Sequence, residues 1–133
     1  MRVLIRVVGA LGIIAASFFA TLSGMNYLWA PCPSGRVTAL TRPYPRFAAT
    51  GFAYVKELPK LDSAGDSSDA PTRSNLLVCE NNNVLAPMHA IHGDIAKQGN
   101  GRYSHWGNSL VFSASDNSDP NTNGRSYWVV QPR

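Results

Sequence analysis

The feature that most constrains this chain is an uncharged, apolar segment near its N-terminus. The 24 residues from Val7 to Ala30 contain no Asp, Glu, Lys, Arg or His. As an α-helix rising about 1.5 Å per residue, this segment is about 36 Å long, enough to cross a hydrocarbon core of about 30 Å with some tilt. Arg6 precedes it directly, and Tyr27 and Trp29 lie near its far end, where amphipathic rings favour the headgroup level. The sequence therefore predicts a short tail and a transmembrane helix over residues 1–30.

A cleavable signal peptide is the alternative interpretation of this segment, because a basic start followed by an apolar run is also typical of one. The only passable pair of small residues for cleavage is Thr21 and Ser23. A lipoprotein cleavage site fits poorly, since Pro31 stands before Cys32 where Gly or Ala is needed. We therefore expect a retained signal-anchor. Because Arg6 abuts the apolar run, we expect the N-terminus in the cytoplasm and the C-terminal part outside it.

A stripe of small residues runs along one face of the predicted helix at four-residue spacing, formed by Gly12, Ala16, Ala20 and Gly24. Transmembrane helices associate through such stripes, because close backbone approach increases van der Waals packing where lipid gives no hydrophobic driving force. The stripe predicts docking against a larger integral-membrane complex, and a photosynthetic or respiratory assembly would be a suitable host. The alternative is that Gly and Ala are simply common in membrane helices.

The remainder of the chain is long enough for one domain only. The whole sequence has 133 residues and a net charge of +4, with 12 Lys and Arg against 8 Asp and Glu, and two of the arginines precede the apolar segment. No basic stripe interleaved with aromatics appears, so nucleic acid is not an expected partner. Residues 31–46, with four prolines and three arginines, are predicted to form an extended connector. Residues 47–133 are predicted to form a β-domain, in which Ser, Asp, Gly and Pro favour a flexible loop at 59–75.

Short runs separated by turn residues predict a small β-sandwich or partial barrel. The expected strands are the second half of 47–58, then 76–80, 84–86, 102–105, 110–115 and 126–130. One short helix is expected at 88–97, entered after Pro87 and ended by Gly99. Cys32 and Cys79 match no metal spacing, and the sequence leaves open whether they form a disulfide or remain separate thiols.

The segment from Gly101 to Tyr127, GRYSHWGNSLVFSASDNSDPNTNGRSY, resembles a recurring module in the C-terminal parts of bacterial proteins of surface-glycan assembly and of sugar or methyl transfer. The run from Leu77 to Ile95 is similar to the first half of that module. The resemblance implies a small β-rich accessory domain that faces carbohydrate, and it transfers no catalytic residue. Together with the signal-anchor and the orientation expected above, the bacterial setting of that module predicts an inner-membrane protein whose C-terminal domain lies in the periplasm.

Three groups of residues in the β-domain are candidates for chemistry. On a helix, His89 and His92 would share one face and could join Asp94 or His105 around a metal, although two polar surface histidines are the commoner case. The loop from Asp119 to Gly124 matches the opening of a calcium loop but lacks the bidentate Glu, which favours a loop that caps its own backbone. No nucleophile elbow or catalytic triad is apparent, so no catalytic residue, metal or cofactor is predicted.

A saccharide-stacking platform is the third candidate, although large rings also fill the cores of small β-domains. Its candidate ligand surface consists of Arg102, Trp106, Asp116, Asp119, Asn121, Asn123, Arg125 and Trp128. Two functions therefore compete. The first is a non-catalytic, single-pass accessory subunit that stabilises or caps a membrane complex from the periplasmic side, and the second is a membrane-tethered glycan-binding module.

Overall fold

The computed structural model describes residues 31–133, apart from the side chains of Asp62 and Ser63. The predicted transmembrane helix, with its small-residue stripe and its flanking Arg6, Tyr27 and Trp29, lies outside the described residues. Between residues 31 and 133, no helix has both the length and the apolar character needed to cross a membrane. These residues form one compact unit, which is mainly β with two sheets and one short α-helix.

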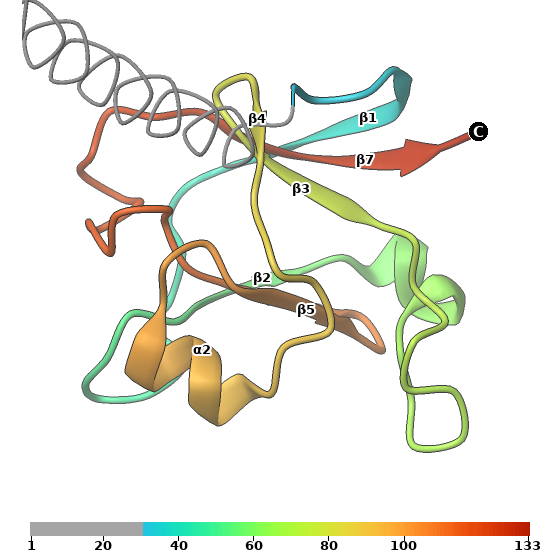
Figure 1. The fold of residues 1–133 in the computed structure, drawn as a ribbon, viewed down its shortest axis with the longest axis horizontal. Helices are drawn as coiled ribbons and strands as arrows, with labels where there is room; N and C mark the ends of the chain where they lie inside the picture. The colour runs from blue at the N-terminus through green and yellow to red at the C-terminus, as the bar shows by residue number, and fades with distance from the viewer. Residues whose placement is uncertain (1–30) are drawn as a thin grey trace, which may run out of the picture. The chain divides into compact units, whose positions relative to one another are not determined.

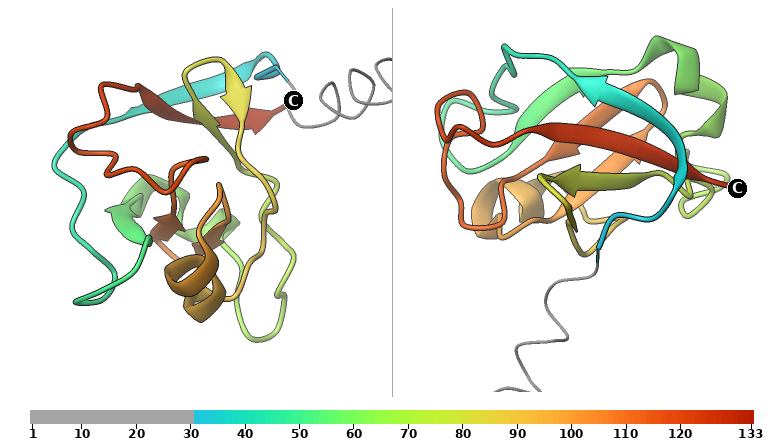
Figure 2. Two further views of the ribbon diagram at one scale, coloured as in Figure 1. Left: turned by 60° about the vertical axis from the view of Figure 1, so that its left-hand side comes forward. Right: turned by 90° about the horizontal axis from the view of Figure 1, so that it is seen from above.

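Two antiparallel sheets form the layers of the domain, and Figure 1 shows them one above the other. Sheet A has the order β1-β7-β3-β4, with bounds Gly35–Leu40, Tyr127–Pro132, Leu77–Glu80 and Asn83–Val84. Sheet B has the order β2-β6-β5, with bounds Tyr54–Glu57, Ser109–Phe112 and Tyr103–Trp106. The α-helix α2 (His92–Gln98) lies on the side of sheet B away from sheet A, as the left view of Figure 2 shows. A 3-10 helix, η2 (Pro59–Ala64), follows β2.

The core fills the space between the sheets, because alternate residues of each strand point to opposite faces. Val78, Tyr127 and Val129 contribute from sheet A, and Tyr103 and Phe112 are among the contributors from sheet B. The rings of Phe112 and Tyr127 lie 5.3 Å apart. This layer of large side chains holds both sheets, so that changes in β5 and β7 affect the same core.

A second apolar cluster attaches α2 to the outer face of sheet B. Val111 points away from the main core and packs with Ile95 of α2, which is fully buried, and with Ala53. The helix begins after Ile91 and ends at Gly99, whose φ of 58° is in the left-handed region that glycine tolerates best. The start of α2 is therefore held beside Ser104 and Trp106, the β5 residues on this outer face.

The connector predicted at residues 31–46 is wrong as a description of the fold, because most of it belongs to the domain. Strand β1 pairs with β7 along its whole length, from Gly35 opposite Pro132 to Leu40 opposite Tyr127. Tyr44 is 2% exposed in the main core. Proline content indicated a linker, but the hydrogen-bond partner that makes this segment a strand comes from the far end of the chain.

The loop predicted as flexible at residues 59–75 is also corrected. Its first part is η2, and the chain then turns inward, so that Asp66 is 1% exposed and Ser74 is buried as well. Asp66 forms a parallel bridge with Trp106 of β5. The segment has few apolar groups to bury, but its backbone and side-chain hydrogen bonds to β5 supply the attachment instead.

The remaining predicted strands and the helix are present with shifted bounds. The largest shift is in the helix, which was expected from residue 88 and begins at His92. Residues 87–90 run beside β5 instead, since Tyr103 N–H donates to Pro87 O over 3.1 Å and Ala90 N–H donates to Tyr103 O over 3.0 Å. This strand-like stretch brings His89 to the edge of sheet B.

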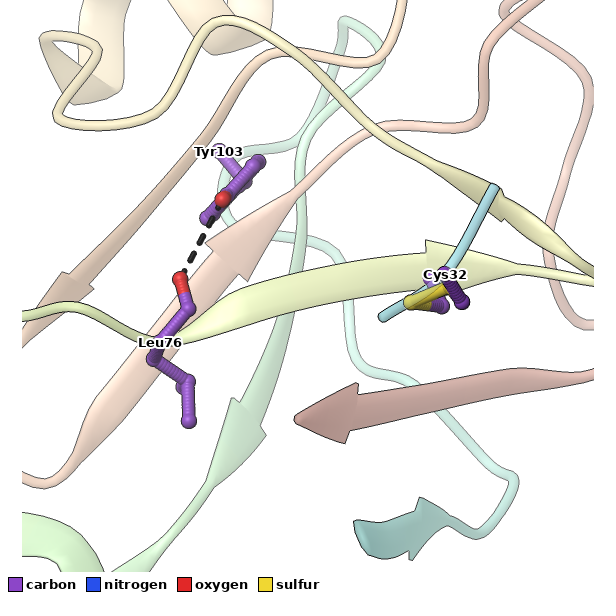
Figure 3. The surroundings of a disulfide bond; sticks show 4 residues. Cys32, Leu76 and Tyr103 are labelled. Atoms are coloured by element: carbon purple, nitrogen blue, oxygen red, sulfur yellow. Dashed lines mark hydrogen bonds between the residues drawn. A yellow bond between two sulfur atoms is a disulfide. The ribbon is translucent and has the colours of Figure 1, made fainter. Parts of the chain in front are cut away.

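A disulfide joins Cys32 to Cys79, with their Cα atoms 6.2 Å apart, so the structure decides between the two alternatives that the sequence left open. Figure 3 shows it on β3, together with the 3.2 Å hydrogen bond that the Tyr103 hydroxyl donates to Leu76 O just before that strand. Cys32 N–H also donates to Asn82 O over 3.0 Å. The start of the described chain is therefore fastened to β3 and to the turn that follows it.

Candidate functional site

The loop between β6 and β7, which the sequence marked as a ligand surface, is occupied by contacts within the protein. Asp116 and Arg125 form an ion pair at 2.7 Å, and Arg125 also reaches the buried Glu80 at 3.1 Å. These contacts lower the pKa of the Asp116 carboxyl far below its usual range, mainly through the hydrogen bond from Arg125. The Asp119 carboxylate accepts from Asn121 N–H over 2.8 Å, and Asn123 Nδ2 donates to the Tyr127 hydroxyl over 2.7 Å.

Hydrogen bonds also fasten the same loop to the segment after β1. Tyr44 N–H donates to Asn121 Oδ1 over 2.7 Å, and Asn121 Nδ2 donates back to Tyr44 O over 3.0 Å. The guanidinium of Arg42 donates to Pro120 O and to Arg125 O. The polar side chains of this loop therefore stabilise the fold. This agrees with the alternative given in the sequence analysis, a loop that caps its own backbone.

The candidate ligand surface is not one surface in the structure. Trp106 ends β5 next to the β5–β6 turn, whereas the loop of residues 116–125 follows the opposite end of β6. Figure 1 shows the two regions on different sides of the domain. Trp128 lies in sheet A between Ala39 and Cys79, and Arg102 donates to Gly99 O over 3.1 Å. Of the predicted ligand residues, only Trp106 lines the pocket described next.

A pocket of about 440 Å³ opens beside β5, where Asp66 and residues 87–90 hydrogen-bond to the chain of this strand. Its lining comes from the 59–75 segment, the 87–92 segment and β5, and includes Asp66, His89, Ile91, His92, Ser104 and Trp106. Ile91 is 72% exposed and Trp106 is 41% exposed, so both present apolar surface to solvent. An exposed aromatic ring and a few converging polar groups are what small-molecule sites typically contain.

His89 and Asp66 form the polar centre of this pocket. His89 Nδ1 lies 2.6 Å from Asp66 Oδ2, and the other carboxylate oxygen accepts from Ser74 N–H over 2.7 Å. The His89 backbone has a φ of 56°, a conformation that residues with side chains adopt rarely and that neighbouring contacts must hold. Asp66 is buried while His89 is 22% exposed at its side chain, so the imidazole is the solvent-facing member of the pair.

His92 forms the wall of the pocket on the α2 side. Burial lowers the pKa of its imidazole, and its ring meets that of Phe47 edge to face at 5.4 Å. Its Nε2 is buried and has no hydrogen-bond partner in the part of the chain that the structure describes. His92 is therefore a neutral, largely apolar wall at pH 7.

The metal set considered from sequence, His89 and His92 with Asp94 or His105, does not converge. Among residues 31–133 no group of three or more His, Cys, Asp or Glu side chains is placed to hold a metal ion. His89 Nδ1 is taken by Asp66, and His105 Nδ1 lies 2.8 Å from Ser74 Oγ in the domain interior. The pocket is therefore organised by hydrogen bonds, including the one between His89 and Asp66.

Asp66 and Ser104 are the polar residues of the pocket that the sequence analysis missed. Asp66 stands in a Ser- and Asp-rich run that is typical of a loop, and nothing local distinguishes it from Asp69. Ser104 carries one usable signal, because it alternates with Tyr103 and His105 in a strand next to Trp106. That alternation places Ser104 and Trp106 on the same face.

No protein-family model matches the chain, and neither a curated protein nor a solved structure shows significant similarity to it. The function must therefore be argued from the geometry of the site.

Proposed function

We propose that residues 31–133 form a saccharide-binding module and that the ligand stacks on Trp106 in the pocket beside β5. The observation that carries the proposal is the exposed indole of Trp106 at a pocket with imidazole, carboxylate and hydroxyl groups. A sugar ring presents C–H groups on its face and hydroxyls around its edge. An amphipathic aromatic ring complements the face, and the polar groups complement the edge.

The arrangement of the lining favours a hydroxyl-rich ligand over a strongly charged one. The Asp66 carboxylate is engaged by its own partners, His89 Nδ1 at 2.6 Å and Ser74 N–H at 2.7 Å, and His92 is neutral. No Lys or Arg lines this pocket among the described residues. Neutral donors and acceptors of this kind orient hydroxyl groups, whereas an anionic ligand would need a compensating cation.

Tryptophan fluorescence of the full chain tests the proposal, with envelope polysaccharide and its oligosaccharide fragments as ligands. We expect saturable quenching in the wild type and its loss in Trp106→Ala, because stacking on that ring supplies the main contact. Trp128→Phe is the matched control: it changes an indole in sheet A that does not line the pocket, and quenching should persist.

Equal quenching in wild type and Trp106→Ala would contradict the proposal, as would loss of quenching in Trp128→Phe alone. The second result would indicate that the saccharide binds at sheet A, beside Trp128.

The membrane-anchored accessory subunit stays a prediction from residues 7–30. We propose its test as co-purification from native membranes in mild detergent. Replacing Ala16 and Ala20 by Leu should release the protein from its partner, because added bulk blocks close helix contact. The matched control replaces Ile14 and Phe18 by Leu, because on a helix these residues would lie on the face opposite the stripe, where acyl chains are expected. Unchanged co-purification of the Ala16→Leu, Ala20→Leu variant would contradict helix docking.

A further inference from the structure

We propose that the pocket also cleaves acyl esters, with Ser104 as the nucleophile, His89 as the general base and Asp66 as the positioning residue. The class of substrate, an acyl ester carried on a saccharide, rests on the proposed function. The catalytic set itself rests on the contact between His89 and Asp66 and on the place of Ser104 in the lining of the same pocket, and not on the ligand that Trp106 binds.

His89 is oriented as a general base requires. Its Nδ1 lies 2.6 Å from a carboxylate oxygen of Asp66, so the proton between them belongs on Nδ1. The other ring nitrogen, Nε2, is then the basic atom, and His89 is the solvent-facing member of the pair in the pocket. A carboxylate that fixes this tautomer and stabilises the imidazolium formed on proton uptake is the role of the acid in serine hydrolases.

Asp66 is held too firmly to be a surface carboxylate that meets His89 by chance. Its backbone N–H donates to His105 O over 2.8 Å, and its own carbonyl accepts from Gly107 N–H over 3.0 Å. Its second carboxylate oxygen accepts from Ser74 N–H over 2.7 Å. The carboxylate is thus fixed at both the backbone and the side chain, which pre-organises the pair before any ligand arrives.

Ser104 supplies the hydroxyl. It lines the same pocket as His89 and Asp66, and the hydrogen bonds between residues 87–90 and Tyr103 hold the His89 segment beside this strand. Its Oγ makes no hydrogen bond to any described residue, in contrast to Ser113, whose hydroxyl donates to Arg102 O over 3.1 Å. We place a hydrogen bond between Ser104 and His89 in the substrate complex, because catalytic hydrogen bonds commonly form or tighten only when substrate is bound.

The second serine–histidine pair of the domain does not compete for this role. Ser74 Oγ lies 2.8 Å from His105 Nδ1, but both residues are buried and the Ser74 hydroxyl also accepts from Leu76 N–H. Neither residue lines the pocket. This pair instead helps to hold Asp66 in place, because Ser74 N–H donates to the Asp66 carboxylate.

The reaction is the hydrolysis of an ester by water. Ser104 Oγ bonds to the carbonyl carbon of the ester while its proton passes to His89 Nε2. The carbon–oxygen bond to the alcohol then breaks, and the alcohol leaves with that proton. Water attacks the acyl-serine, giving its proton to the same nitrogen, and the carboxylic acid leaves as the Ser104 hydroxyl is restored.

Labelling with a fluorophosphonate probe tests the set on the full chain in mild detergent. Ser104 Oγ would bond to phosphorus, the phosphorus–fluorine bond would break, and fluoride would leave. We expect one label per chain by intact mass, mapped to Ser104 in the peptide digest. Ser104→Ala should abolish labelling and His89→Gln should slow it at least about a hundredfold. Ser109→Ala, which changes the residue opposite Trp106 in β6, is the matched control and should label normally.

The role of Asp66 is tested by measuring both the labelling rate and the stability of its variants, because a purely structural residue would affect the two together. Asp66→Asn keeps an oxygen for Ser74 N–H but loses the charge, so labelling should slow while the urea unfolding midpoint changes little. Asp66→Glu should restore part of the rate. Equal losses of rate and stability in both variants would show that Asp66 only supports the fold.

The outcomes separate this proposal from the saccharide-binding one. A folded wild type that is quenched by polysaccharide but takes no label, or takes it elsewhere than Ser104, overturns the catalytic set alone. Labelling at an unchanged rate in His89→Gln overturns it as well. Specific labelling of Ser104 without any saccharide quenching supports the catalytic set and overturns the saccharide as the carrier of the ester.

Discussion

Breaking the bond between Cys32 and Cys79 is the most direct test of whether the start of the described chain belongs to the folded domain. The two cysteines are 47 positions apart. On the chain-entropy model, a crosslink that closes a loop of this length destabilises the unfolded state by about 4 kcal/mol. Cys32→Ser should therefore lower the free energy of unfolding by about that amount. With a slope of roughly 1.5 kcal/mol per M of urea, the midpoint should fall by about 2 to 3 M.

The assay is urea unfolding of the full chain in mild detergent, followed by tryptophan fluorescence. Cys32 is the better residue to change, because Cys79 is fully buried and a serine there would add the cost of an interior hydroxyl. Reduction of the wild type is the control and should reproduce the variant. A shift well below about 1 M in both samples would refute the loop-closure reasoning, and a shift in the variant alone would assign the effect to the serine.

Three further predictions use the same unfolding assay or a titration. Glu80→Ala should cost about 3 kcal/mol, because the Ser115 and Tyr127 hydroxyls lose a buried acceptor. The lowered pKa of Asp116 means that its contribution is present above its ordinary pKa of about 4 and is lost as the pH falls, so Asp116→Asn should flatten the acid side of the stability profile. Burial raises the pKa of Tyr103 to about 12, so Tyr103→Phe should remove a late-ionising group from the ultraviolet pH titration, and loss of a group that ionises near pH 10 would contradict this.

Local signals in the sequence were sufficient for the strands that follow one another through short turns. Three asparagines follow β3, and the first, Asn81, has a φ of 51°, a left-handed conformation that asparagine accepts more readily than most residues. The strand and the turn can therefore both be predicted from a few neighbouring residues.

β1 could not be predicted in this way. Its residues are largely exposed, and its pairing partner β7 lies at the far end of the described chain, so no local apolar pattern marks it. The prolines around it resemble those of a linker until that partner is known.

The candidate site, like the strands, could be predicted only in part from local signals in the sequence. His89, His92 and Trp106 were singled out as residue types with chemistry, but their grouping depends on a carboxylate that the sequence places in a loop-like run. Asp66 becomes a buried acceptor only because His89 and Ser74 meet it in the folded state. Contacts of this kind between distant segments carry no signature in a single sequence.

Because β7 lies between β1 and β3, it also determines at what point in synthesis sheet A can be completed. β1 and β3 do not pair with each other; each hydrogen-bonds to β7, on its two opposite edges, and the right view of Figure 2 shows this strand between them. A nascent chain that lacks residues 127–132 can therefore form only the β3–β4 pair of sheet A. Until β7 is present, β1 therefore has no partner strand, and its exposed residues remain an unpaired segment.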